Sequence, residues 1–112
     1  MNKVVFFAFK ENKMCFTHLL LNSLDIVEKG GQAKIIFEGS AVKLPQVLEE
    51  EKNPLYIRAK KAGIIEGVCE ACSKTMGVYE TNKDLGMTFL NDLKGHPAME
   101  KYMSDGFEIV IL

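Results

Sequence analysis

The stretch from Val4 to Phe9 restricts the possible folds of this chain more than any other part of its sequence. It reads Val-Val-Phe-Phe-Ala-Phe, an apolar run rich in β-branched and aromatic residues, without polar alternation. Such a run indicates a strand that is buried on both faces, as in the middle of a parallel sheet. Because parallel strands are joined by crossover connections that are usually helices, the run predicts an α/β fold.

The rest of the chain alternates strand-like and helix-like segments, as that fold requires. Strands are predicted at residues 4–9, 33–38, 64–68 and 107–112, with a weaker one at 87–90. Helices are predicted between Asn12 and Gly30, from Leu44 to Glu51, after Pro54, from the cysteine pair to Gly77, and between Pro97 and Gly106. We therefore predict one domain, residues 1–112, with a mostly parallel sheet of about five strands and right-handed crossovers.

Composition and charge exclude several classes of partner. Fourteen basic and fifteen acidic residues give a net charge of −1, so no large field favours nucleic acid or an anionic membrane. The apolar run after Met1 is too short for a signal peptide, and no run is long enough to span a bilayer. Three cysteines are an odd number and do not suggest a disulfide framework. We therefore expect a protein of the reducing cytoplasm.

A Cys-x-x-Cys pair follows the predicted strand at residues 64–68. Cys72 is expected at the turn into a helix, where unpaired backbone N–H groups, the helix dipole and nearby Lys74 favour the thiolate. Cys69 is expected to be buried at the end of the strand, with a raised pKa. The sequence therefore predicts that Cys72 is the reactive thiol.

The loops at the carboxyl ends of parallel strands meet at one edge of the sheet, where ligands bind in folds of this class. These loops are residues 10–13, 38–40 and 69–75. Gly39 and Ser40 join a strand to a helix with a permissive backbone and a hydroxyl, a natural cradle for an anion. The candidate ligand-binding residues are Lys10, Gly39, Ser40, Ser73, Lys74 and Thr75.

A Cys-x-x-Cys pair has three common uses. It can be a dithiol redox pair, half of a zinc site, or a sulfur carrier in which one cysteine accepts a sulfane sulfur. A zinc site needs two more ligands, and Cys15, His18 and His96 are scattered along the sequence. We therefore predict no metal and no cofactor, and the residues alone leave the redox and carrier uses open.

Three short motifs, in order along the chain, resemble those of the DsrE/DsrF-like proteins. Ile-Ile-Phe-Glu-Gly-Ser-Ala-Val at 35–42 resembles their strand-Gly-x-Ala-Val turn. Ala-Cys-Ser-Lys-Thr-Met at 71–76 resembles their cysteine motif. Gly-Phe-Glu-Ile-Val-Ile at 106–111 resembles their final strand. The resemblance covers nearly the whole chain.

This resemblance implies a flavodoxin-like three-layer α/β sandwich with helices on both faces of the sheet, often assembled into trimers or hexamers. Some such proteins carry persulfide sulfur between donor and acceptor proteins. Cys72 matches the motif cysteine and Gly39 the turn glycine, whereas Cys69 is not part of the motif. We therefore expect a sulfur carrier that uses Cys72. The alternatives are a non-catalytic module that binds a small anion, and a Cys69/Cys72 dithiol redox sensor.

Self-association is a further expectation from the residues. Apolar residues make up 47% of the chain, and five large ones gather late in the sequence. Apolar surface that remains after one core has formed commonly marks an interface. These five residues are Met87, Phe89, Met99, Tyr102 and Met103.

Overall fold

The computed structural model describes all residues from Met1 to Leu112 and shows an all-parallel sheet of five strands in the order β4-β3-β2-β1-β5. The strands are β1 (Lys3–Ala8), β2 (Gln32–Phe37), β3 (Ile65–Cys69), β4 (Phe89–Leu90) and β5 (Glu108–Ile111). The helices are α1 (Lys13–Glu28), the 3₁₀ helix η1 (Gly39–Lys43), α2 (Leu44–Glu50), α3 (Pro54–Lys61), α4 (Glu70–Thr75), α5 (Tyr79–Asp84) and α6 (Glu100–Ser104). The predicted α/β class and parallel sheet are confirmed.

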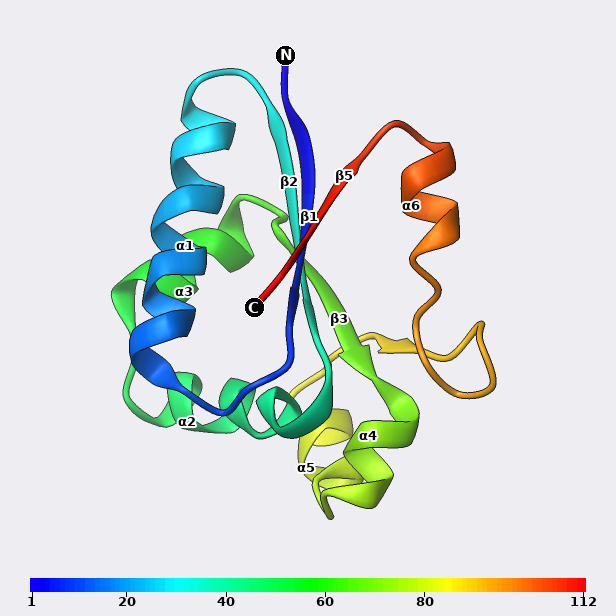
Figure 1. Cartoon of the computed structure of the whole chain (residues 1–112). Coiled ribbons are helices and arrows are strands. Elements are labelled where there is room, and N and C mark those ends of the chain that lie inside the picture. The colour runs from blue at the N-terminus through cyan, green and yellow to red at the C-terminus, as the bar shows by residue number, and fades with distance from the viewer.

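Helices cover both faces of the sheet, which Figure 1 shows nearly edge-on, with α1 and α3 on one side and α6 on the other. Alternate residues of β1 supply the two cores, as the two-residue period of a strand requires. Phe6 packs in a core of 19 buried residues with α1, α2 and α3. Phe7 points the other way, into a core of five buried residues completed by Tyr102 and Phe107. The apolar run of β1 is thus buried on both faces, as predicted.

Side-chain caps set the starts of two helices. The Asn12 side chain accepts a hydrogen bond from Cys15 N and so caps the start of α1, at the boundary where the sequence predicts this helix to begin. The Asn53 side chain accepts from Tyr56 N, and Pro54 follows at the first position of α3, where its missing N–H costs nothing. No helix of the structure is both long and apolar enough to cross a bilayer.

The last helix is shorter than the sequence predicts. We expected it to start near Pro97, but α6 begins at Glu100. The residues before it form a tight antiparallel turn in which Leu93 and His96 pair, while Lys94 and Gly95 both have positive φ. A turn of this kind cannot continue into a helix, so residues 91–99 stay a loop.

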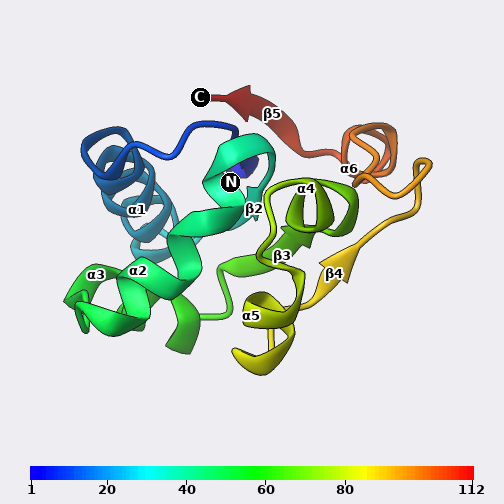
Figure 2. The ribbon, with the colours of Figure 1, turned by 90° about the horizontal axis from the view of Figure 1, so that it is seen from below.

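The loops at the carboxyl edge of the sheet come together, as predicted. Figure 2 views this edge and shows η1 beside α4. The Ser40 hydroxyl accepts a hydrogen bond from Glu11 N at 3.0 Å and donates to Phe9 O at 3.4 Å, so it ties the loop after β1 to the loop after β2. Gly39 has φ +52°, and a Cβ there would lie 2.7 Å from Phe9 O. Gly39 therefore allows these two loops to approach closely.

Replacing Gly39 by alanine should destabilise the fold. The left-handed backbone alone costs an alanine roughly 1–2 kcal/mol, and the clash with Phe9 O adds an overpacking cost of typically ~1–3 kcal/mol. Gly77→Ala is the matched control, because Gly77 also has a positive φ, +71°, but a Cβ there would meet no atom within 4 Å. Denaturant unfolding should show the larger loss of stability for Gly39→Ala. Equal losses would contradict this steric role.

Candidate functional site

The two cysteines of the pair have different environments. Cys69 is the last residue of β3 and the N-cap of α4, and its side chain is fully buried. Its Sγ accepts a hydrogen bond from Cys72 N at 3.3 Å. Cys72 lies in the first turn of α4 and is partly exposed. The predicted difference in burial between the two thiols is confirmed.

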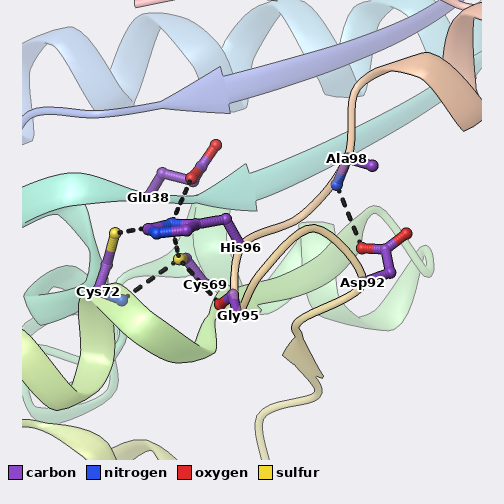
Figure 3. A network of polar contacts seen from close by, with 7 residues as sticks. All are labelled: Glu38, Cys69, Cys72, Asp92, Gly95, His96 and Ala98. Carbon is purple, nitrogen blue, oxygen red and sulfur yellow. Dashed lines mark hydrogen bonds and ion pairs between the residues drawn. The ribbon is translucent and has the colours of Figure 1, made fainter.

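The loop after β4 packs against the start of α4. The Gly95 carbonyl accepts a hydrogen bond from Ala71 N at 2.9 Å, and the Asp92 carboxylate accepts one from Ala98 N at 3.2 Å. Figure 3 shows the Asp92–Ala98 hydrogen bond and places Gly95 and His96 beside Cys69. The loop is therefore held at its tip and at its base, and it carries His96 to the cysteines.

Three side chains meet around one nitrogen of His96. Its Nδ1 lies 3.1 Å from Cys69 Sγ, 3.8 Å from Cys72 Sγ and 3.8 Å from a Glu38 carboxyl oxygen. One donor atom from each of the four residues lies within 4.8 Å of the others (Figure 3). We call Glu38, Cys69, Cys72 and His96 the four-residue cluster. It joins the ends of β2 and β3 to the loop after β4.

Glu38 brings a carboxyl group into the cluster from the end of β2, and it is only 6% exposed. Burial raises the pKa of this carboxyl, and the nearby His96 and Cys69 side chains act in the opposite direction. Its nearest charged partner, His96 Nδ1, is 3.8 Å away. A buried carboxyl with so distant a partner costs stability, so a structural role alone gives a poor account of it.

Cys69 is held as a neutral thiol. Burial raises its pKa to about 12, outweighing the Cys72 backbone N–H that stabilises the thiolate. The Cys72 side chain and the Glu38 carboxyl raise the pKa further. The direction of this shift agrees with the sequence-based prediction. With its proton in place, Cys69 can donate a weak hydrogen bond to Gly95 O, which lies 3.7 Å from Sγ.

The N–H groups predicted to lie free at the start of α4 are engaged within the protein. Cys72 N donates to Cys69 Sγ, and Ala71 N donates to Gly95 O. Cys69, not Cys72, therefore takes the position at the cap. This arrangement leaves the first turn of α4 a poor cradle for an anion.

The other residues predicted around Cys72 have different partners. Lys74 lies 3.9 Å from the Glu70 carboxylate and over the ring of Tyr79, not at a thiol. Ser73 is buried, and its hydroxyl accepts a hydrogen bond from the Asn82 side chain. Thr75 is exposed at the end of α4. Their predicted roles in ligand binding stay predictions.

A separate apolar cavity of about 380 Å³ lies where the carboxyl ends of β1 and β5 meet. Lys10 and Cys15 line it, together with Phe9 and Leu112. This is where the strand order reverses, so the usual ligand position of this fold class and the four-residue cluster are at different points of the same edge. Lys10 thus lines the cavity, while Gly39 and Ser40 join the neighbouring loops.

Sequence reasoning missed His96 and Glu38. It treated His96 as part of a helix start and Glu38 as the end of a strand, so it found no further ligands for the cysteine pair. The fold brings both residues to the pair, so two further donor groups lie beside the cysteines. The weak strand predicted at 87–90 could have revealed His96. In a parallel sheet the carboxyl end of this strand lies at the same edge as the cysteines, so the loop that follows it lies there too.

Cys69 should resist alkylation in the folded protein. Its side chain is fully buried, whereas Cys15 is exposed and Cys72 partly exposed. Treatment with iodoacetamide followed by peptide mass spectrometry should modify Cys72 and Cys15 first and Cys69 only after denaturant is added. Modification of native Cys69 at the rate of Cys72 would contradict the buried position.

Comparison with known proteins identifies a relative that matches nearly the whole chain. No protein-family model matches the chain, and no solved structure matches it. The chain is 35% identical to uncharacterized protein MJ0733 of Methanocaldococcus jannaschii, in an alignment of 116 residues that covers 98% of this chain and 95% of that protein. This similarity extends over both sequences almost from end to end. The chain therefore belongs to the same family as MJ0733.

Proposed function

We propose that the protein is a DsrE-like sulfur carrier in which Cys72 accepts a sulfane sulfur and passes it on. One observation carries the proposal: Cys72 is the partly exposed thiol of the pair, and its Sγ lies 3.8 Å from His96 Nδ1. The position of Cys72 at the carboxyl edge and the three motifs shared with DsrE/DsrF-like proteins support it. MJ0733 gives no activity to transfer.

The chemistry requires one thiolate and a donor that holds sulfane sulfur, such as a persulfide. The Cys72 thiolate attacks the outer sulfur of R–S–SH and forms a new S–S bond. The bond from that sulfur to R–S breaks, and its electron pair leaves with R–S⁻, which takes up a proton. The product is the Cys72 persulfide, with no net oxidation. An acceptor thiolate then attacks the outer sulfur of the Cys72 persulfide, the S–S bond breaks, and Cys72 leaves as the thiolate.

His96 can assist by taking the Cys72 proton. Nδ1 can accept only when it is unprotonated and not occupied by another donor. The Cys69 S–H group can donate to Gly95 O instead, which leaves Nδ1 available for Cys72. His96 thus acts as the base that generates the nucleophile.

The burial of Cys69 also protects a sulfur held on Cys72. A Cys69 thiolate could attack the inner sulfur of the persulfide, expel HS⁻ and form a disulfide. A fully buried, neutral thiol is a poor nucleophile for that reaction. The persulfide should therefore survive until an acceptor arrives.

The two alternative functions receive unequal support. The proximity of the Cys69 and Cys72 sulfurs, within the 4.8 Å spread of the cluster, favours a dithiol redox sensor as the second candidate. A small-anion binding module receives less support. The Glu38 carboxyl lies at the cluster, and Ser40 is already engaged with Glu11 N and Phe9 O.

Cys72→Ser should abolish sulfur uptake. Chelator-treated, reduced protein is incubated with a small persulfide donor, and its intact mass is measured. Because Cys15 is exposed and can also take up sulfur, the comparison is made in the Cys15→Ser background. Cys15→Ser should gain one sulfur atom, and Cys15→Ser/Cys72→Ser should gain none because no accessible nucleophile of the cluster remains.

Other outcomes separate the candidates. A loss of two hydrogens on oxidation, without sulfur gain, would support the dithiol sensor. No change with either reagent would leave the carrier and sensor proposals both refuted. His96→Gln should slow sulfur uptake at neutral pH and approach the wild-type rate at alkaline pH, where a base is no longer needed.

We further propose self-association, through the edge of β5. Ile111 is 56% exposed and Met103 61%, whereas Tyr102, one of the five apolar residues singled out in the sequence, is buried. An edge strand with exposed apolar side chains is a surface on which a second chain can pair. The trimer or hexamer implied by the DsrE resemblance is one form of such an assembly.

Sedimentation should show an oligomer at micromolar concentration. Ile111→Glu should shift the population towards monomer, because it places a charge on the β5 edge. Leu21→Glu is the matched control, as Leu21 is similarly exposed at 48% but lies on α1. A monomeric wild type, or equal effects of the two variants, would refute the proposed interface.

A further inference from the structure

We propose that Glu38, Cys69, Cys72 and His96 form a tetrahedral site for a thiophilic divalent cation, with Zn²⁺ as the best fit. The proposal rests on donor atoms and their positions alone. It holds whether or not Cys72 also carries sulfur, so it goes beyond the proposed function.

The donor atoms already have nearly the spacing of a zinc site. Bonds of about 2.3 Å to sulfur and about 2.0 Å to nitrogen or oxygen in a tetrahedron separate the donors by roughly 3.3–3.8 Å. His96 Nδ1 lies 3.1 Å from Cys69 Sγ and 3.8 Å from both Cys72 Sγ and a Glu38 oxygen. All four donor atoms lie within 4.8 Å of one another, so side-chain shifts of about an ångström would bring them to the spacing of a tetrahedral site.

The chemistry of the donors selects the class of metal. Two cysteine sulfurs and an imidazole nitrogen favour zinc and related transition metals over Mg²⁺ and Ca²⁺, which prefer oxygen ligands. Four protein donors, with no vacant position, match a structural rather than a catalytic zinc site. The two-residue spacing of Cys69 and Cys72 is typical of such sites.

The surroundings also suit a cation. Glu38 places a carboxyl in a buried position whose nearest charged partner is a histidine nitrogen 3.8 Å away. A bound cation would supply the compensating charge there. It would also link three segments, the ends of β2 and β3 and the loop held by Asp92 and Gly95 (Figure 3). Cys72 and His96 lie on the exposed side, which gives the metal a route of entry.

Metal and sulfur would compete for Cys72. Binding displaces the protons of both thiols, and a metal-bound Cys72 thiolate is not free to attack a persulfide. Removal of the metal would restore the nucleophile. The two proposals therefore describe two uses of one thiol that exclude each other in any one molecule.

Titration of the reduced, metal-free full chain with Co²⁺ tests the site. Co²⁺ serves as a spectroscopic probe for zinc. We expect one equivalent to bind, with thiolate-to-metal charge-transfer absorption and the strong visible bands of tetrahedral cobalt. Zn²⁺ should then displace it. Loss of a residue that only supports a metal ligand typically weakens metal binding roughly 10- to 100-fold. Loss of a ligand should cost at least as much, and we expect this loss of cobalt affinity in each of the variants Cys72→Ser, Cys69→Ser, His96→Gln and Glu38→Gln.

Matched variants outside the cluster control for general effects. Cys15→Ser and His18→Gln remove the same residue types from exposed positions on α1 and should leave cobalt binding unchanged. Absence of stoichiometric cobalt and zinc binding at micromolar concentration would overturn the proposal. So would equal losses in these control variants and the cluster variants.

A second measurement needs no variant and so does not depend on folding of a mutant. Zn²⁺ should protect Cys72 of the wild type from alkylation, and a chelator should restore its reactivity, while exposed Cys15 reacts equally in both states. Unchanged Cys72 reactivity would refute the site. Sulfur uptake is measured with chelator present, so a failed sulfur assay with intact cobalt binding refutes only the carrier function, and the converse refutes only the metal site.

Discussion

The parallel pairing of the strands is the constraint on which the site depends. Because β2, β3 and β4 run in one direction, the residues that follow them must emerge at the same edge of the sheet. Glu38, Cys69 and His96 are far apart in sequence and meet only for this reason. Were one of these strands antiparallel, its following loop would lie at the opposite edge.

The pairing of β4 is the weakest part of this framework. Only two residue pairs join β4 to β3. The two strands can approach this closely because Gly67 has no side chain, since a Cβ there would lie 2.5 Å from Thr88 O. The position of the following loop therefore depends on further contacts, above all the bond from Ala71 N to Gly95 O. Backbone contacts, rather than the strand alone, aim His96 at the cysteines.

Much of the fold could be predicted from the sequence, because the governing patterns are local. The apolar run of β1 and the helix start after Pro54 depend on residues close in sequence, and both appear in the structure as expected. The partly exposed Cys72 and buried Cys69 also follow from their places after a buried strand.

The full site could not be predicted in the same way. The loop that carries His96 has no periodicity, and its shape comes from a turn at Lys94 and Gly95 and from contacts with α4. Glu38 looked like the polar end of a strand, since nothing nearby in sequence shows that the fold will bury it. Both residues join the cluster through contacts with residues that are distant in the sequence.

The burial of the four side chains determines how the cluster can act. Glu38 and Cys69 are enclosed, so their environment is fixed by the fold, whereas Cys72 and His96 can reach solvent. A reagent or ion arriving from outside therefore meets Cys72 and His96 first. Cys69 and Glu38 can bind only an ion that has already reached Cys72 and His96, and in metal ligation Cys69 must lose its proton. In sulfur transfer, by contrast, Cys69 must stay protonated and must not react with the Cys72 persulfide. Under the two proposals, the state of the Cys69 thiol therefore distinguishes metal binding from sulfur transfer.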